Sequence, residues 1–135
     1  MPIHPQNDAL EEMAARDADV PVVMLNLLRF REDAEPGHGV DGLTGEEAYR
    51  EYGRRFSTLQ PRFGGEPVWM GRVEAVPIGS ENETWDLAIL VRYPTRGRFL
   101  SMISDPDYQA ISPLRTAALS DSRLVEMTQL LPSRN

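Results

Sequence analysis

Residues 22–30 read Val-Val-Met-Leu-Asn-Leu-Leu-Arg-Phe, and this stretch decides the fold. Apolar and β-branched side chains occupy both alternating faces, which is typical of a central β-strand covered on both sides. A membrane span needs roughly 18 apolar residues, and the apolar run around this stretch is interrupted by Pro21 and Asn26. We therefore predict a buried strand, and we expect no membrane partner.

Helical patterns flank this strand on both sides. Apolar spacings of three and four residues predict a short amphipathic helix over 7–18, with Asn7 as its cap. Thr44 and Glu47 form a capping-box pattern, and the apolar periodicity that follows predicts a helix over 45–59. The second of these helices is the next element after the strand, and an acidic, glycine-rich loop connects the two.

The remaining elements follow the same strand-and-helix logic. Alternating patterns predict strands over 68–76 and 85–93, which form a hairpin, and a fourth strand over 123–131. Between the hairpin and the fourth strand, Thr95 and Asp105 are caps for two consecutive helical segments. We expect the second segment to kink or restart at its internal proline.

The order of these elements predicts an α+β protein with a ferredoxin-like βαββαβ fold, in which helices cover one face of a four-stranded antiparallel sheet. Residues 1–21 are then an N-terminal helical extension, and residues 22–135 form the domain. The other sheet face is also apolar, and large apolar patches usually mark an interface. We therefore predict a homodimer whose two sheets face each other and close a dimeric α/β barrel.

The strand alternation leads to a first hypothesis about the site. The purely aliphatic faces suit packing against the helices; they carry Val23, Leu25 and Leu27 on one strand and Leu87, Ile89 and Val91 on another. Asn26 and Arg92 would then point away from the helices, into the dimer. Buried polar groups of this kind are paired, hydrated or functional. We predict that these two residues are catalytic and polarise a carbonyl or carboxylate of a substrate.

Six further residues are candidates for substrate binding: Tyr49, Tyr52, Trp69, Arg72, Tyr108 and Arg115. The two helical tyrosines lie three positions apart and can present phenols to a pocket, although such a stripe is also typical of core packing. Asp107, Tyr108 and Arg115 can frame an anion site near a helix N-terminus. Alternatively, the aspartates complement the helix dipole and Arg115 forms a surface ion pair, while Trp69 is a packing anchor.

The composition of the chain excludes further classes of function. A chain of 135 residues fits one domain, and its net charge of −7 argues against nucleic acid and anionic membranes as partners. The absence of cysteine favours a cytoplasmic protein. His4 and His38 are the only histidines and neither has a second ligand at metal spacing, so no metal and no cofactor are expected. All 14 basic residues are arginine, which favours bidentate anion recognition.

Several segments together resemble the bacterial domain of unknown function 1330: Tyr-Arg-Glu-Tyr at 49–52, Phe-Gly-Gly at 63–65, Trp-Asp-Leu-Ala-Ile-Leu at 85–90, Asp-Pro-Asp-Tyr-Gln-Ala at 105–110, Pro-Leu-Arg at 113–115 and Asp-Ser-Arg-Leu at 121–124. The resemblance covers residues 22–131. That family is similar to the dimeric α/β-barrel superfamily, which includes cofactor-free monooxygenases, lactone isomerases, haem-degrading enzymes and effector-binding domains. The haem-degrading members use an Asn, Trp and His set, for which only Asn26 and Trp69 are counterparts here.

These observations leave two functional hypotheses. In the first, the chain is a small-molecule-binding protein or a cofactor-independent enzyme of oxygenase or isomerase type, which acts on a small acidic or aromatic metabolite. In the alternative, it is a non-catalytic homodimeric interaction or effector-binding module. The fold alone does not choose between them.

Overall fold

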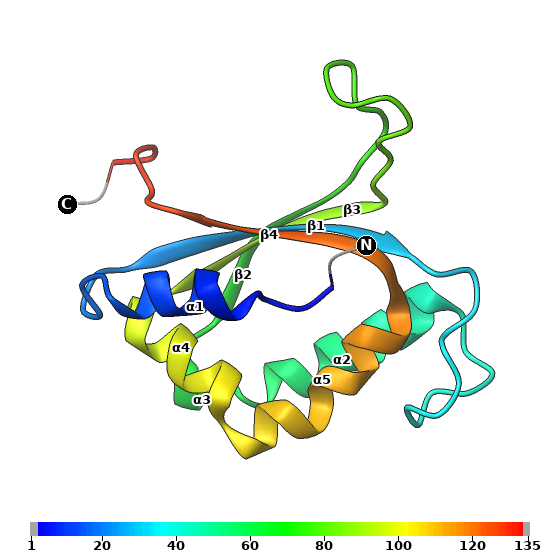
Figure 1. The fold of residues 1–135 in the computed structure, drawn as a ribbon, viewed down its shortest axis with the longest axis horizontal. Helices are drawn as coiled ribbons and strands as arrows, with labels where there is room; N and C mark the ends of the chain where they lie inside the picture. Colours follow the sequence, from blue (N-terminus) through cyan, green and yellow to red (C-terminus); the bar gives the residue numbers. More distant parts are fainter. Residues whose placement is uncertain (1–2, 134–135) are drawn as a thin grey trace.

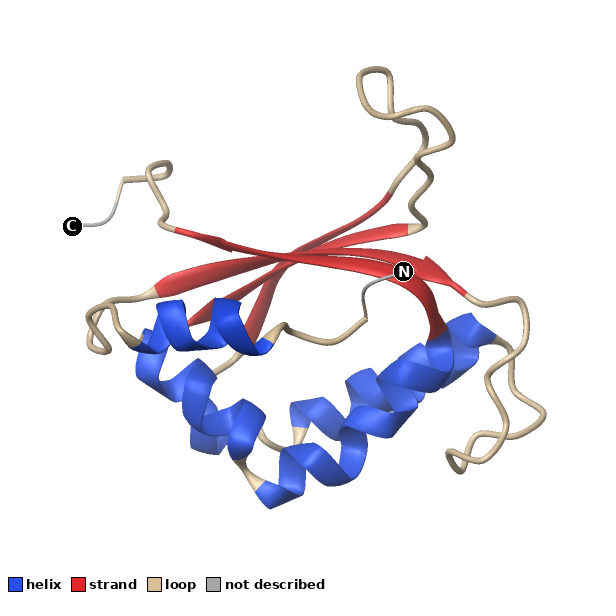
Figure 2. Cartoon of the chain, viewed as in Figure 1, coloured by secondary structure: helices blue, strands red, loops and turns tan. Residues whose placement is uncertain are grey.

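The computed structural model describes residues 3–133 and folds them into one sheet and one helical layer (Figure 1). In chain order the elements are α1 (Asn7–Ala14), β1 (Val22–Phe30), α2 (Gly45–Ser57), α3 (Gln60–Phe63), β2 (Glu66–Arg72), β3 (Leu87–Tyr93), α4 (Arg96–Ser104), α5 (Pro106–Ala118) and β4 (Leu119–Met127). These helices all lie on one side of the sheet, and the connection between β2 and β3 extends on the other side (Figure 2). No described helix is both long and apolar enough to cross a bilayer.

The sheet confirms the predicted α+β class and the ferredoxin-like βαββαβ fold. Its strand order is β2-β3-β1-β4, and each neighbouring pair is antiparallel. The residues predicted to form the central strand are the residues of β1, which pairs with β3 on one side and β4 on the other. The register places Asn26 of β1 opposite Ile89 of β3 and Leu124 of β4.

Helix α2 begins with the capping box that the sequence predicts at Thr44 and Glu47. The Thr44 hydroxyl accepts a hydrogen bond from the Glu47 backbone N–H at 3.1 Å, and the Glu47 carboxylate accepts one from the Thr44 N–H at 2.9 Å. This capping box satisfies two N–H groups that have no partner inside the helix. The next residue, Gly45, has no room for a side chain, because a Cβ would lie 2.1 Å from the Arg31 carbonyl oxygen. The chain therefore enters α2 through a close backbone contact with the end of β1.

The helices cover the face of β1 opposite to the predicted one. The β1 side chains in the buried core are Val22, Met24 and Leu28, and the predicted aliphatic face of Val23, Leu25 and Leu27 contributes none to that cluster. The prediction for β3 is confirmed, because Ile89 and Val91 are in the core and Leu87 packs against it. Alternation does not decide between two apolar faces, whereas the register pairs Met24 with Val91 and so turns it toward the helices.

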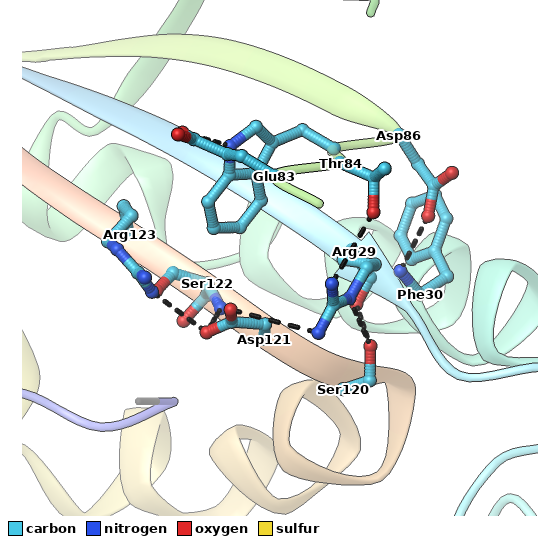
Figure 3. Close-up of polar contacts among 10 residues, drawn as sticks. Arg29, Phe30, Glu83, Thr84, Asp86, Ser120, Asp121, Ser122 and Arg123 are labelled. Carbon is cyan, nitrogen blue, oxygen red and sulfur yellow. Dashed lines mark hydrogen bonds and ion pairs between the residues drawn. The ribbon is translucent and has the colours of Figure 1, made fainter. Parts of the chain in front are cut away.

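The uncovered sheet face has a polar network at one end (Figure 3). Arg123 of β4 donates to the Asp121 carboxylate at 2.8 Å and lies over the Trp85 ring at 5.1 Å. The Trp85 indole N–H in turn donates to Glu83 at 2.9 Å, and Arg29 of β1 pairs with Asp121 at 3.8 Å. These contacts attach the connection between β2 and β3 to the opposite edge of the sheet. The rest of this face is predominantly apolar.

Some element ends differ from the prediction. Helix α1 ends at Ala14, and its N-cap is Gln6, not Asn7. Helix α5 continues through Pro113 without a restart. A proline removes the hydrogen bond to the carbonyl four residues earlier, and here the carbonyl of that residue, Gln109, accepts from the Ser112 hydroxyl at 3.2 Å.

The fourth strand also lies earlier in the chain than predicted. Strand β4 begins at Leu119 and ends at Met127, whereas the pattern predicted 123–131. Strand β4 follows α5 without a loop, and no turn residue in the sequence marks the boundary between the helix and the strand.

Candidate functional site

A cavity of about 520 Å³ lies between the helix-covered face of the sheet and the helical layer. Residues from all four strands line it, together with α1, α2, α4 and α5 and residues 3–6. Apolar side chains form most of its wall, including Met24, Ile89, Val91, Phe99 and Met102. A largely apolar cavity of this size with a few polar groups is typical of a small-molecule site.

Asn26 of β1 is one of the polar residues through which the sheet lines this cavity, together with Ser122 and Glu126 of β4. Its side chain is only 9% exposed, and its strand neighbours Ile89 and Leu124 are apolar. Among residues 3–133 no group forms a hydrogen bond with its amide, yet no buried polar side-chain atom is left without a partner. The amide therefore reaches the open space of the cavity. The predicted orientation of Asn26 toward a dimer partner is wrong, because the register turns it toward the helices.

A tyrosine cluster forms the wall between α2 and α5. The Tyr52 and Tyr108 hydroxyl groups are 2.9 Å apart, and their rings meet edge to face with centroids 6.4 Å apart. The ring centroids of Tyr49 and Tyr52, which lie on the same helix, are 5.3 Å apart. Burial raises the pKa of Tyr49 to about 12 and the pKa of Tyr52 well above its ordinary value. These phenols therefore stay neutral at physiological pH and can donate hydrogen bonds.

Arg115 of α5 adds a positive charge to the same wall. Its guanidinium donates to the Ile3 carbonyl oxygen at 2.7 Å and interacts with the Tyr49 phenol, which counteracts part of the rise in the Tyr49 pKa. Within residues 3–133 Arg115 forms no ion pair with a carboxylate. The expected surface ion pair of Arg115 is therefore not formed in the described part of the chain.

The aspartates that were expected near Arg115 have another partner. Arg62 of α3 forms ion pairs with Asp105 at 2.6 Å and Asp107 at 2.5 Å. Asp105 also caps α5 by accepting a hydrogen bond from the Asp107 N–H at 2.8 Å. The two aspartates thus belong to the junction of α3 and α5, and only Tyr108 and Arg115 of the proposed anion site line the cavity.

The N-terminal segment forms one wall of the cavity and is held there by charged contacts. Arg96 is 7% exposed; it donates to Glu126 of β4 at 2.7 Å and to the Asp17 carbonyl oxygen. Arg16 pairs with the same Glu126 carboxylate. Glu126 lines the cavity, but two guanidinium groups neutralise it.

Three predicted site residues lie outside this cavity. Arg92 is on the uncovered sheet face, 3.4 Å from Glu66, so it does not share a pocket with Asn26. Trp69 is paired with Leu90 on β3, which places it on that same face, and it is 56% exposed. Arg72 ends β2 as an exposed residue. The structure therefore brings together Asn26, Tyr49, Tyr52, Tyr108 and Arg115.

Sequence reasoning missed two chemically useful residues of the cavity wall. His4 lines it, with its Nε2 atom 3.4 Å from the Thr116 hydroxyl, although a residue so near the terminus gives no pattern in the sequence. Tyr93 ends β3 in the core, and burial raises its pKa. Strand alternation could have identified Tyr93, because it places Tyr93 on the same face of the strand as Ile89 and Val91. No cluster of His, Cys, Asp and Glu suited to a metal occurs in residues 3–133.

An antiparallel sheet with helices on one face and a cavity between the layers defines the chain as a ferredoxin-like α+β protein. It belongs to the family described as "Domain of unknown function (DUF1330)", which matches residues 40–128. This confirms the resemblance inferred from the sequence. No functionally curated protein matches the chain.

Solved structures extend the comparison. The chain is 38% identical to RPA0582, a protein of unknown function from Rhodopseudomonas palustris, with a TM-score of 0.86 over 96% of this chain and 98% of that one. A dimeric ferredoxin-like protein of unknown function from Bacteroides fragilis is 12% identical, with a TM-score of 0.52 over 82% and 98%. A hydroxynitrile lyase from Passiflora edulis is 10% identical, with a TM-score of 0.57 over 84% and 99%. At such low identity the last two show a shared fold.

Proposed function

We propose that the chain is a small-molecule-binding protein that acts as a cofactor-independent enzyme of oxygenase or isomerase type. The observation that supports this most directly is the Asn26 amide, which lies on a nine-tenths buried residue of the central strand and is accessible from a cavity of about 520 Å³. A polar amide on a buried strand contributes less to stability than an apolar side chain of the same size. Its presence on a central strand is explained if a ligand in the cavity forms a hydrogen bond with it.

The polar groups of the cavity suit chemistry at a carbonyl. Both proposed reaction types begin when a substrate loses a proton and leaves an anion on a carbonyl oxygen. The Asn26 amide and the hydroxyl groups of the Tyr52–Tyr108 pair are donors that can stabilise such an anion. His4 lines the same cavity, and we assign it the role of accepting the proton. An isomerase returns that proton to a different carbon, whereas an oxygenase uses dioxygen as the co-substrate and oxidant.

The comparisons give limited support to a catalytic function. One protein with this fold is a hydroxynitrile lyase, so the ferredoxin-like scaffold is able to host an enzyme of small molecules. The likeness does not transfer that reaction, because function depends on site residues rather than on the fold.

We also propose that the protein acts as a homodimer through its uncovered sheet face. This face carries Leu25, Leu27, Leu90, Trp69 and Val125, of which Trp69 is 56% exposed and Val125 is 42% exposed. An apolar sheet face of this kind usually marks an interface. Several proteins with the same fold are dimeric. Dimerisation of this face leaves the cavity, on the other side of the sheet, free to bind a ligand.

The experiment that tests this function is native mass spectrometry of protein purified gently from its own host. We expect a dimer with a retained small molecule. Asn26→Leu is the test variant, because leucine has a similar volume and cannot donate a hydrogen bond. Arg92→Leu is the matched control, since it also replaces a polar strand residue but lies on the face away from the cavity.

The two variants separate the proposed roles. If the cavity binds the molecule, Asn26→Leu loses it and Arg92→Leu retains it. A molecule retained equally by both variants contradicts the assignment of the site. A dimer that is empty in all three proteins, and that shows no stabilisation by any small carboxylic acid or carbonyl compound in a thermal-shift screen, contradicts the proposed function.

A further inference from the structure

The charge of Arg115 is the one feature of the cavity that the proposed function leaves unexplained. Each of the other arginines of the wall has a carboxylate partner: Arg16 pairs with Glu126, which also pairs with Arg96, and Arg123 pairs with Asp121. Glu12 of α1 also lines the cavity and is exposed to solvent. Arg115 alone combines partial burial with the lack of a carboxylate partner among residues 3–133.

The neighbours of Arg115 do not neutralise it. The Ile3 carbonyl accepts one hydrogen bond from its Nη1 atom, and a guanidinium has five N–H donors. The Tyr49 phenol also contacts the guanidinium, but its pKa is raised to about 12, so it remains neutral. Partly buried cations are normally paired, because desolvation of an unpaired charge is costly. The wall therefore carries an uncompensated positive charge in a largely apolar cavity.

We propose that the ligand of this cavity is an apolar or aromatic monocarboxylate, whose carboxylate binds Arg115 and whose apolar body lies between the helices and the sheet. A planar guanidinium matches a carboxylate with two parallel hydrogen bonds. The apolar wall of Met24, Ile89, Val91, Phe99 and Met102 provides the space for the body of the molecule. This inference rests on the proposed function and specifies the class of its ligand.

The hydrogen bond to the Ile3 carbonyl places the Arg115 guanidinium against the N-terminal segment, which forms one wall of the cavity. Arg115 also borders a second, smaller cavity of about 340 Å³, which shares Ile3, His4 and Tyr108 with the first. The carboxylate therefore binds where the N-terminal segment meets α5, and the Asn26 amide on β1 remains free for a second polar group of the ligand.

The test uses acids and their neutral amides, which have nearly the same shape but differ in charge. Calorimetric titration at pH 7 compares benzoate, 2-naphthoate and 4-phenylbutyrate with the three corresponding amides. We expect at least one acid to bind roughly 10- to 100-fold more tightly than its amide, as a charged hydrogen-bonded pair predicts. Arg115→Met should remove this preference while the amide still binds.

Two further variants control for other effects. Arg50→Met removes an exposed arginine of α2 that pairs with Glu46, and it should keep the preference of the native protein. Arg115→Lys keeps the charge without the planar fork, so it should retain a reduced preference. Arg115→Gln replaces Arg115→Met if that variant fails to fold.

Each outcome decides the inference. Equal affinity of the native protein for acid and amide contradicts a carboxylate ligand and leaves the proposed small-molecule function standing. A preference that persists in Arg115→Met shows that another group binds the carboxylate and overturns the assignment to Arg115. If none of the acids binds, the inference is wrong, and the proposed function then depends on the result of native mass spectrometry.

Discussion

Replacement of Asn26 by leucine is expected to stabilise the protein while it removes ligand binding. Asn26 is 9% exposed on the central strand β1, between Ile89 and Leu124, and its amide is accessible from the cavity. An amide buried without a partner costs about 1–3 kcal/mol. Water in the cavity recovers part of this cost, so we take about 1 kcal/mol for the amide.

Leucine adds a second contribution. It is a better strand former than asparagine and extends the apolar surface of the neighbouring side chains, for which we take up to about 1 kcal/mol. The expected gain in the free energy of unfolding is therefore about 1–2 kcal/mol. With an unfolding entropy of about 2.1 cal/mol/K per residue, this corresponds to a rise in Tm of roughly 4–7 °C for this chain.

The assay is urea unfolding followed by circular dichroism, together with a thermal scan, at one fixed protein concentration because a dimer's stability depends on concentration. Asn26→Asp is the control, since it has the same shape and buries a charge, and it should destabilise the protein. The reasoning is refuted if Asn26→Leu lowers the free energy of unfolding by 1 kcal/mol or more. Such a loss would mean that the amide forms a structural hydrogen bond.

Four other predictions follow from the same structure. Tyr52→Phe and Tyr108→Phe should each cost about 1 kcal/mol, and the double variant should cost the same as one of them; additive losses in urea unfolding would disprove a direct hydrogen bond. The pKa of Tyr49 is raised from about 10 in the unfolded chain to about 12 by burial, so its contribution to stability is complete below pH 10 and is lost between pH 10 and 12, roughly 2 kcal/mol; in Tyr49→Phe the alkaline loss should be smaller. Arg96→Met leaves a carboxylate and a backbone carbonyl of the N-terminal segment without this partner, and should lower the free energy of unfolding by about 2–3 kcal/mol and speed proteolysis of that segment. Leu25→Arg on the uncovered sheet face should give a folded monomer in analytical ultracentrifugation, and a surviving dimer would exclude this face as the interface.

Much of the fold was predictable because local signals agree with the tertiary structure. The capping box at Thr44 and Glu47 and the alternation of β1 depend on contacts within a few residues, which the sequence displays directly. The end of α1 and the start of β4 were less accurate, because no strong breaker marks either boundary. The tyrosines and Arg115 could be named as site candidates because helical spacing places them on one face.

The pairing of Asn26 with Arg92 was wrong for a physical reason. Both faces of β1 are apolar, so burial of either face is compatible with its sequence, and a choice of face for one strand does not follow from its own pattern. The hydrogen-bond register with β3 resolves this, because it aligns Asn26 with Ile89 and Arg92 with Val23 on opposite sides of the sheet. His4 lines the cavity only because the N-terminal segment packs against α5, which its own sequence does not indicate.

The sequence by itself determined the family, the order of the elements, the α+β class and the presence of two apolar sheet faces, since these depend on local periodicity and capping. Only the tertiary structure decided which face the helices cover, that Arg115 lines the cavity without a carboxylate partner among the described residues, and that the N-terminal segment forms part of the cavity wall. These properties depend on contacts between residues far apart in the chain. Arg115 and Ile3, for example, are 112 positions apart and meet only when α5 and the N-terminal segment pack together.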